Sequence, residues 1–200
     1  DETEGDRNTA VGVFALSNQN TTGGGNIYNT AVGYGAGNAV TTGVDNTLIG
    51  SLAGDAITTG GNNTVLGKQA LSADTKGGTA VAIGQLALGA QNFTSATDAY
   101  NTAVGYEAGQ AVTTGVNNTF VGGLAGDATD DGANNTAIGK SALSANCGDS
   151  NTAIGAGALN VTTGTLNTAV GKDAGVAVTT GGTNTLIGGS SGDAITSASA

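Results

Sequence analysis

The stretch Asn101-Thr102-Ala103-Val104-Gly105-Tyr106-Glu107-Ala108, which is followed by Thr113-Thr114-Gly115, is one copy of the motif that decides the fold. Its centre, Asn-Thr-apolar-apolar-Gly, recurs with small variations along the whole 200-residue chain. The eleven motif glycines are 16 to 21 residues apart, and they are Gly12, Gly33, Gly50, Gly67, Gly84, Gly105, Gly122, Gly139, Gly155, Gly171 and Gly188. Such internal repetition indicates a repeat architecture.

A longer period of four repeats lies on top of the first. Four residues after each motif glycine stands Gly or Leu, in a Gly, Gly, Leu, Leu cycle, as Leu16, Gly37, Gly54, Leu71, Leu88, Gly109, Gly126, Leu143, Leu159, Gly175 and Gly192. Four-repeat units begin near residues 29, 101 and 167. We therefore predict a single repeat array over residues 8–200, after a solvated acidic lead-in over 1–7, and we expect the array to continue beyond residue 200.

The composition restricts the class of protein. The chain holds 37 Gly, no Pro, Trp, Met or His, and only 10% charged residues. Without Pro and without a three-residue period it is not collagen. A net charge of −10 disfavours binding to nucleic acid or anionic lipid. No apolar run approaches the length of a membrane-spanning helix.

Each Asn-Thr-Ala-Val-Gly stretch predicts a short strand, because β-branched residues are bounded there by Gly and Asn. A period of 16–21 residues matches one coil of a parallel β-solenoid, or β-roll, of about eleven coils. Equivalent residues then stack, so that Asn29, Asn46 and Asn63 form an Asn ladder. The segment 68–73 can be a bent strand or a one-turn helix within an otherwise all-β fold. The Gly of each Thr-Thr-Gly turn is expected to supply a positive φ.

Both alternate positions of the repeated strand are apolar, as with Ala31 and Val32, so both faces need cover. The second cover is either another part of the same coil or another chain. We predict self-association into a homotrimer, with Phe120 and Leu186 as bulky interchain contacts; a helical filament and a monomer are the alternatives. Within the four-repeat cycle, the glycines should mark close approach and Leu71, Leu88, Leu143 and Leu159 should be buried.

These residues resemble known repeats. Asn101–Ala108 with Thr113-Thr114-Gly115 resembles the repeats of bacteriophage tail fibres and related bacterial surface proteins. Val81-Ala82-Ile83-Gly84-Gln85-Leu86-Ala87-Leu88 is similar to the repeats of trimeric autotransporter adhesin heads. The resemblance implies a trimeric parallel β-roll or shaft used for attachment, on a virion surface, a bacterial cell surface or another extracellular fibre, with shallow multivalent contact to a receptor or glycan.

Catalytic constellations are not evident. Without His, neither a Ser-His-Asp triad nor a His metal ligand can form. Asp55, Asp127 and Asp193 occupy equivalent positions, and Asp130 and Asp131 extend the densest acidic cluster; they are interpreted as turn carboxylates, and a carboxylate pair for glycoside cleavage is the alternative. Cys147 is interpreted as a small turn residue, with an intermolecular disulfide as the alternative. We predict no enzyme activity and no catalytic, cofactor-binding or metal-binding residues. An ice-binding face built from the Thr-Thr turns is a further, weaker hypothesis.

Overall fold

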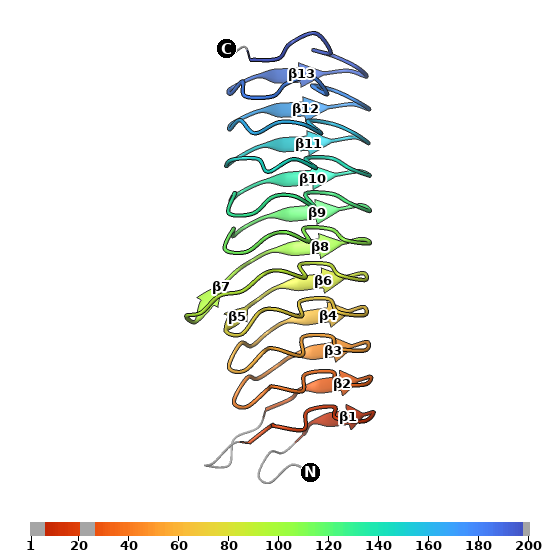
Figure 1. Ribbon diagram of the computed structural model, residues 1–200, viewed down its shortest axis with the longest axis vertical. Coiled ribbons are helices and arrows are strands. Elements are labelled where there is room, and N and C mark those ends of the chain that lie inside the picture. The colour runs from red at the N-terminus through yellow and green to blue at the C-terminus, as the bar shows by residue number, and fades with distance from the viewer. Residues whose placement is uncertain (1–6, 21–26, 198–200) are drawn as a thin grey trace.

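The computed structural model describes residues 7–20 and 27–197, so that most of the 1–7 lead-in lies outside the described residues. The described chain is a stack of coils, each of which adds one short strand to a parallel sheet (Figure 1). The eleven strands of this main sheet are β1 (Thr9–Val11), β2 (Thr30–Val32), β3 (Thr47–Ile49), β4 (Thr64–Leu66), β6 (Val81–Ile83), β8 (Thr102–Val104), β9 (Thr119–Val121), β10 (Thr136–Ile138), β11 (Thr152–Ile154), β12 (Thr168–Val170) and β13 (Thr185–Ile187).

Every strand pairs with its neighbour in the register that the repeat predicts. Thr102 of β8 pairs with Thr119 of β9, and Val104 with Val121, so that equivalent residues stack. Since parallel strands lie about 4.8 Å apart, eleven of them make a rod about 50 Å long. The predicted all-β parallel solenoid is confirmed. Among the described residues no segment is helical, and the stretch 68–73 that could have formed a helical turn is a bend with positive φ at Gln69 and Leu71.

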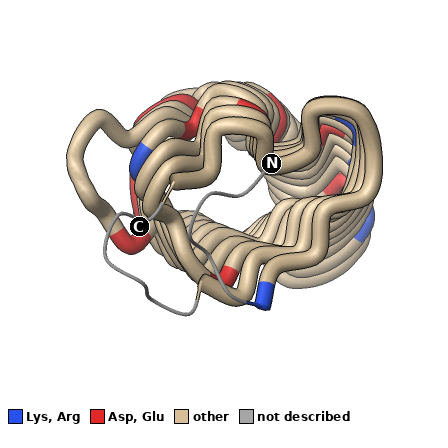
Figure 2. Tube along the Cα trace, turned by 90° about the horizontal axis from the view of Figure 1, so that it is seen from below, with Lys and Arg blue, Asp and Glu red and all other residues tan. Residues whose placement is uncertain are grey.

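The core lies inside each coil and is thin. The middle residue of each three-residue strand between the two terminal coils points inward, so that Ala103, Ala137 and Ala153 are fully buried, whereas Ala10 in the first strand is exposed. The Ala three residues after the motif glycine packs against it, as Ala108 and Ala142 do. Viewed along the rod, the coils superimpose as an oblong ring (Figure 2). One chain therefore covers one face of its strands by itself.

Large side chains in this core are placed opposite glycines. Leu48 is fully buried, and a Cβ added at Gly37 or at Gly54 would lie 2.6 or 2.8 Å from its methyl groups. The leucines of the four-repeat cycle, Leu71, Leu88, Leu143 and Leu159, are fully buried, as predicted. Phe120, which the sequence placed at a chain interface, is fully buried in its own coil, and Leu186 is packed against the same core, so this assignment of interchain contacts is wrong.

The predicted Asn ladder is confirmed and has a specific hydrogen-bond pattern. The Oδ1 atom of Asn29 accepts from the backbone N–H of Asn46 at 2.8 Å, and Asn46 does the same for Asn63 at 3.1 Å. The Nδ2 group of Asn46 donates to the Gly60 carbonyl at 3.0 Å. Each buried amide thus ties its coil to the next one, at the following ladder asparagine and at the Thr-Thr-Gly turn just before it, and satisfies backbone groups that the short strands leave unpaired.

Two kinds of glycine shape the coil. At Gly105 φ is 147°, and a Cβ there would lie 2.4 Å from the carbonyl oxygen of Gly122, so that only glycine fits the motif position. The prediction for the Thr-Thr-Gly turns is wrong, because Gly43 does not have a positive φ. Glycine is needed at position 43 because a Cβ added there would lie 2.4 Å from the carbonyl oxygen of Gly60. The left-handed residue of that corner is Asp45, with φ of 57°.

Candidate functional site

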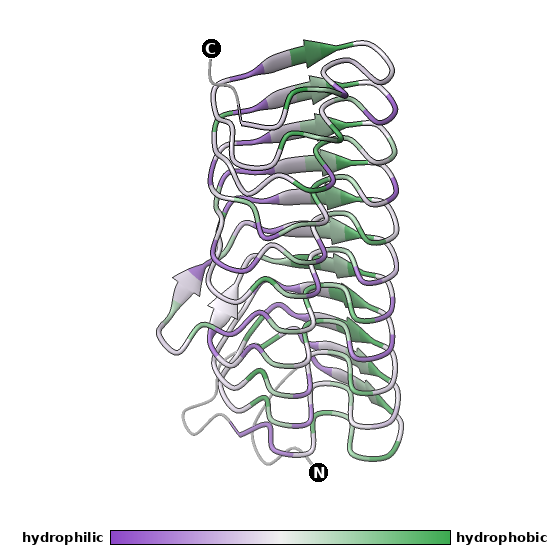
Figure 3. Cartoon of the chain, turned by 45° about the horizontal axis from the view of Figure 1, so that its top comes forward, coloured by the Kyte–Doolittle hydropathy of each residue, from purple (hydrophilic) through white to green (hydrophobic). Residues whose placement is uncertain are grey.

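The exposed side of the main sheet carries two regular columns of side chains. We call the outer face the set of first and third residues of the eleven strands β1–β4, β6 and β8–β13. The first residue is Thr in ten strands and Val81 in β6, and the third is Val, Ile or Leu in all eleven. No residue of the outer face is charged. The apolar column is visible as aligned green arrowheads in Figure 3. In a chain with 15 carboxylates, this face is a neutral strip along the rod.

The aliphatic column of the outer face is accessible to solvent. Six of its eleven members are exposed, among them Val121 at 36%, Leu66 at 46% and Ile187 of the last coil at 73%, and the other five are half-buried. Single exposed apolar side chains are common on proteins, but a contiguous row of them marks an interaction surface. Thr and β-branched residues also favour strands on their own account, which explains part of the regularity.

Exposed columns beside the outer face vary from coil to coil. The corner just before each ladder asparagine is Tyr28 in one coil, Asp45 in the next and Asn62 in the third. Tyr100 occupies the same corner four coils after Tyr28 and is 59% exposed. At the other end of their strands, Tyr34 and Tyr106 are also exposed. In each of two four-repeat units, therefore, one coil has a tyrosine at both ends of its strand.

In the Thr-Thr turns, the hydroxyl of the first threonine donates a hydrogen bond to the next coil. The Oγ1 atom of Thr41 donates to the Thr58 carbonyl at 3.1 Å, and that of Thr58 donates to the Thr75 carbonyl at 2.9 Å. These hydroxyls link successive coils and are only partly exposed. The turns therefore differ from the free threonine array that an ice-binding face at this position requires.

The acidic residues singled out by the sequence lie in turns and bends of three different coils, and Asp193 is exposed in the last of them. Asp55 and Asp127 sit in equivalent places, and burial raises the pKa of each carboxyl above its usual value. One oxygen of each is buried without a hydrogen-bond partner. Asp130 accepts a hydrogen bond from the Thr113 hydroxyl, and Asp131 is exposed. In the part of the chain that the structure describes, no three His, Cys, Asp or Glu side chains gather closely enough to hold a metal ion.

Cys147 faces the interior. Its thiol is buried, and its Sγ atom lies 3.4 Å from the Thr129 hydroxyl oxygen. Burial raises the pKa of the thiol, which disfavours the reactive thiolate. A buried thiol of this kind does not reach a second chain, so an intermolecular disulfide at Cys147 is not compatible with the folded coil.

The regular stack is interrupted by one outgrowth. From Gly84 to Gly105 the coil has 21 residues instead of 17, and its loop leaves the stack as β7 (Thr97–Asp98), which pairs in parallel with β5 (Gly77–Gly78) (Figure 1). The corresponding long coil near the N-terminus passes through residues 21–26, outside the described residues.

A buried carboxylate anchors this loop. Asp74 is fully buried, and its carboxylate accepts from the N–H of Gly77 at 2.9 Å, from the N–H of Phe93 at 3.1 Å and from Gln91 Nε2 at 2.7 Å. The Oε1 atom of Gln91 accepts from Asn101 at 2.8 Å. These hydrogen bonds lie in the coil where Ala80 stands in place of the ladder asparagine. Asp74 and Gln91 there supply buried polar contacts, including one to the next ladder residue, Asn101.

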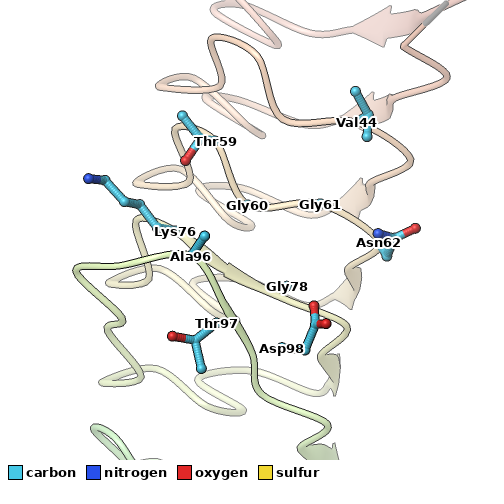
Figure 4. A pocket seen from close by; sticks show the side chains of 10 residues that line it. All are labelled: Val44, Thr59, Gly60, Gly61, Asn62, Lys76, Gly78, Ala96, Thr97 and Asp98. Carbon is cyan, nitrogen blue, oxygen red and sulfur yellow. The ribbon is translucent and has the colours of Figure 1, made fainter.

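A polar hollow of about 320 Å³ lies beside the outgrowth. Its floor is the backbone of Gly60, Gly61 and Gly78, and its walls are formed by Val44, Thr59, Asn62, Lys76, Ala96, Thr97 and Asp98 (Figure 4). Thr59 and Lys76 lie toward one end, and Asn62 and Asp98 toward the other. Neither the hollow nor the role of Asp74 was predicted from the sequence; the signal was the 21-residue spacing, which shows that residues leave the coil but not what they enclose.

Comparisons with models of known protein families, with curated proteins and with solved structures found no match to this chain. No helix within residues 7–20 and 27–197 has the length and apolar character needed to cross a membrane.

Proposed function

We propose that this chain is a shaft segment of an extracellular attachment fibre, in which copies associate side by side through the outer face. The observation that supports the proposal is the exposed aliphatic column, which repeats once per coil along the rod. A row of Val, Ile and Leu on a neutral strip is favourable to bury, because burial energy scales with apolar area. A second copy in the same register presents the matching row.

Association as a homotrimer around a common axis is the form that the resemblance to tail fibres and adhesin heads implies. It would cover the outer face of every copy, whereas a helical filament would grow with concentration. In either assembly the turns and the corner tyrosines remain outside, where they can contact a receptor. The rod itself is stiff because strand pairing, the Asn ladder and the turn hydroxyls all link neighbouring coils. A virion fibre and a bacterial surface adhesin are both served by this arrangement.

The test is a pair of lysine substitutions measured by light scattering. Val121→Lys places a charge in the outer face, and Thr114→Lys places the same charge in an exposed turn. We expect the wild type and Thr114→Lys to have about three times the mass of one chain, 18.9 kDa, and Val121→Lys to be monomeric. A monomeric wild type, or a Val121→Lys variant of unchanged mass, would overturn the proposed assembly.

Ice binding is a second candidate function, and the threonine column of the outer face favours it. Ten of eleven strands present a Thr beside an aliphatic residue at a repeat of about 4.8 Å on a neutral surface. Hydroxyl and methyl groups in such a regular array can order water into an ice-like layer. Measurement of thermal hysteresis decides this: activity that is lost in Thr119→Lys and kept in Thr114→Lys supports ice binding, and no activity in the wild type excludes it.

A further inference from the structure

We propose that the hollow between the β7 loop and the neighbouring coils binds a neutral sugar. The loop that closes it is held in place from below, because Asp74 receives three hydrogen bonds at its root and Phe93 is only 7% exposed. The hollow is therefore a built part of the structure and is formed before a ligand arrives. Its volume of about 320 Å³ is at the lower end of small-molecule sites and suits one or two sugar rings.

The lining selects the class of ligand. The backbone of Gly60, Gly61 and Gly78 shapes the floor, and the carbonyls of these glycines already accept hydrogen bonds within the chain. The groups left for a ligand are two hydroxyls, one amide, one carboxylate and one ammonium, on Thr59, Thr97, Asn62, Asp98 and Lys76. These groups offer hydrogen-bond donors and acceptors in nearly equal number, which matches a ring that carries several hydroxyl groups. Val44, Ala96, the threonine methyl groups and the Lys76 stem add apolar surface beside these polar groups, as suits the C–H faces of a sugar ring.

Charge excludes other ligands. Lys76 and Asp98 carry opposite charges, so the hollow has no net charge of its own. A phosphate would meet one ammonium and one carboxylate, and a divalent cation would find a single carboxylate where six or more oxygen ligands are usual. A neutral polyhydroxylated ligand suits both ends of the hollow, since its hydroxyl groups can accept from Lys76 at one end and donate to Asp98 at the other.

Tyr100 places an aromatic ring beside Asp98. Its side chain is 59% exposed, and its hydroxyl lies 3.5 Å from Asp98 Oδ2. An exposed ring next to a carboxylate can lie against the C–H face of a sugar while the carboxylate holds its hydroxyls. The biological use of such a site rests on the proposed attachment function, but the binding itself does not require the fibre.

The experiment is a titration of the isotopically labelled chain with methyl glycosides of glucose, mannose, galactose and N-acetylglucosamine, followed by NMR. We expect at least one of them to shift the backbone signals of Asn62, Gly78 and Thr97 to Tyr100. Asp98→Ala should weaken that binding by about tenfold or more, the loss expected for a hydrogen bond to a charged group. Tyr100→Ala should weaken it as well, and Tyr100→Phe should keep most of it.

Two exposed positions provide matched controls. Asp131→Ala removes a carboxylate from a turn in another coil, and Tyr106→Ala removes a tyrosine from the far end of β8; neither should change binding. The proposal is overturned if no glycoside shifts these signals, if Asp98→Ala binds as the wild type does, or if an acidic sugar binds more tightly than its neutral counterpart. A chain that proves monomeric but binds the glycoside would overturn the fibre and leave this site standing.

Discussion

The ring of Phe120 fills the space that a side chain at Gly109 would need: a Cβ added there would lie 2.8 Å from its Cδ2 atom. Gly126, in the coil of Phe120 itself, is blocked by the other edge of the ring. Leu186 stands in the same relation to Gly175 and Gly192. The Gly, Gly, Leu, Leu cycle therefore reflects packing. Where the middle residue of a strand is large, it fills the core space that leucines at the turn positions of two successive coils would otherwise occupy, and both of those positions are Gly.

This relationship predicts a compensating pair of substitutions. Phe120→Ala alone should lower the free energy of unfolding by about 3–5 kcal/mol, because it leaves a cavity. Gly109→Leu alone should lower it by about 1–3 kcal/mol through overpacking. Leu88 has nearly the same φ as Gly109, 51° against 59°, so backbone strain does not prevent the exchange. Denaturant melts of the double variant should show less loss than the sum of the two single losses, and strict additivity would contradict this packing relationship.

A second prediction concerns the Asn ladder. Asn118→Ala removes the Oδ1 acceptor of the Asn135 N–H at 2.9 Å and the Nδ2 donor to the Gly132 carbonyl at 2.8 Å. Each orphaned backbone group costs about 1–3 kcal/mol, so the variant should be strongly destabilised. Asn18→Ala, at an exposed position, is the control and should melt within about 0.5 kcal/mol of the wild type. Equal melting of both variants would show that the ladder does not support the coils.

The motif glycine is the third test. Gly105→Ala should prevent folding, because the residue has φ of 147° and a Cβ would meet the Gly122 carbonyl oxygen at 2.4 Å. Gly123→Ala is its matched control, since a Cβ there finds nothing nearer than 3.9 Å and the backbone is not left-handed. Circular dichroism of the two variants should show loss of the β signal in the first and its retention in the second. A folded Gly105→Ala variant would contradict the coil geometry.

A fourth prediction follows from Asp127, whose pKa is raised mainly by burial. A carboxyl whose pKa is higher in the folded state stabilises the fold below its unfolded pKa, and this contribution is lost as pH rises through the folded value. Asp127→Asn should therefore raise the free energy of unfolding slightly at pH 7, by less than about 1 kcal/mol because the group stays partly solvated. Near pH 3 the difference from the wild type should vanish. A variant less stable than the wild type at pH 7 would show that the carboxylate is favourable where it stands.

Much of this fold could be predicted from the sequence because identical coils stack residue on residue. The strand positions, the register, the buried leucines and the Asn ladder all follow from the repeat. Which face of the strand points into the core did not follow from the repeat, because Ala103 and Val104 are both apolar. A three-residue strand leaves only its middle residue inside. That ambiguity placed Phe120 on the wrong side of the sheet.

Left-handed corners and the outgrowth were missed for another reason. Non-glycine residues with positive φ are uncommon, and although Asp and Asn favour this conformation, as at Asp45, the same corner is Tyr28 or Leu166 in other coils, so residue type does not mark it. Asp74 reads as a turn carboxylate, and its burial depends on Gln91, which comes one coil later. Sites formed by an exception to a repeat are visible in its spacing, but their lining is decided by contacts between coils.

The proposed association of copies in register through the outer face is tested most directly by disulfide trapping. Val121→Cys in a Cys147→Ser background should form covalent dimers of the chain on mild oxidation, because in-register association brings equivalent residues of β9 together. Thr114→Cys in the same background should stay monomeric on a denaturing gel. No crosslinking at either position, or equal crosslinking at both, would contradict association through the outer face.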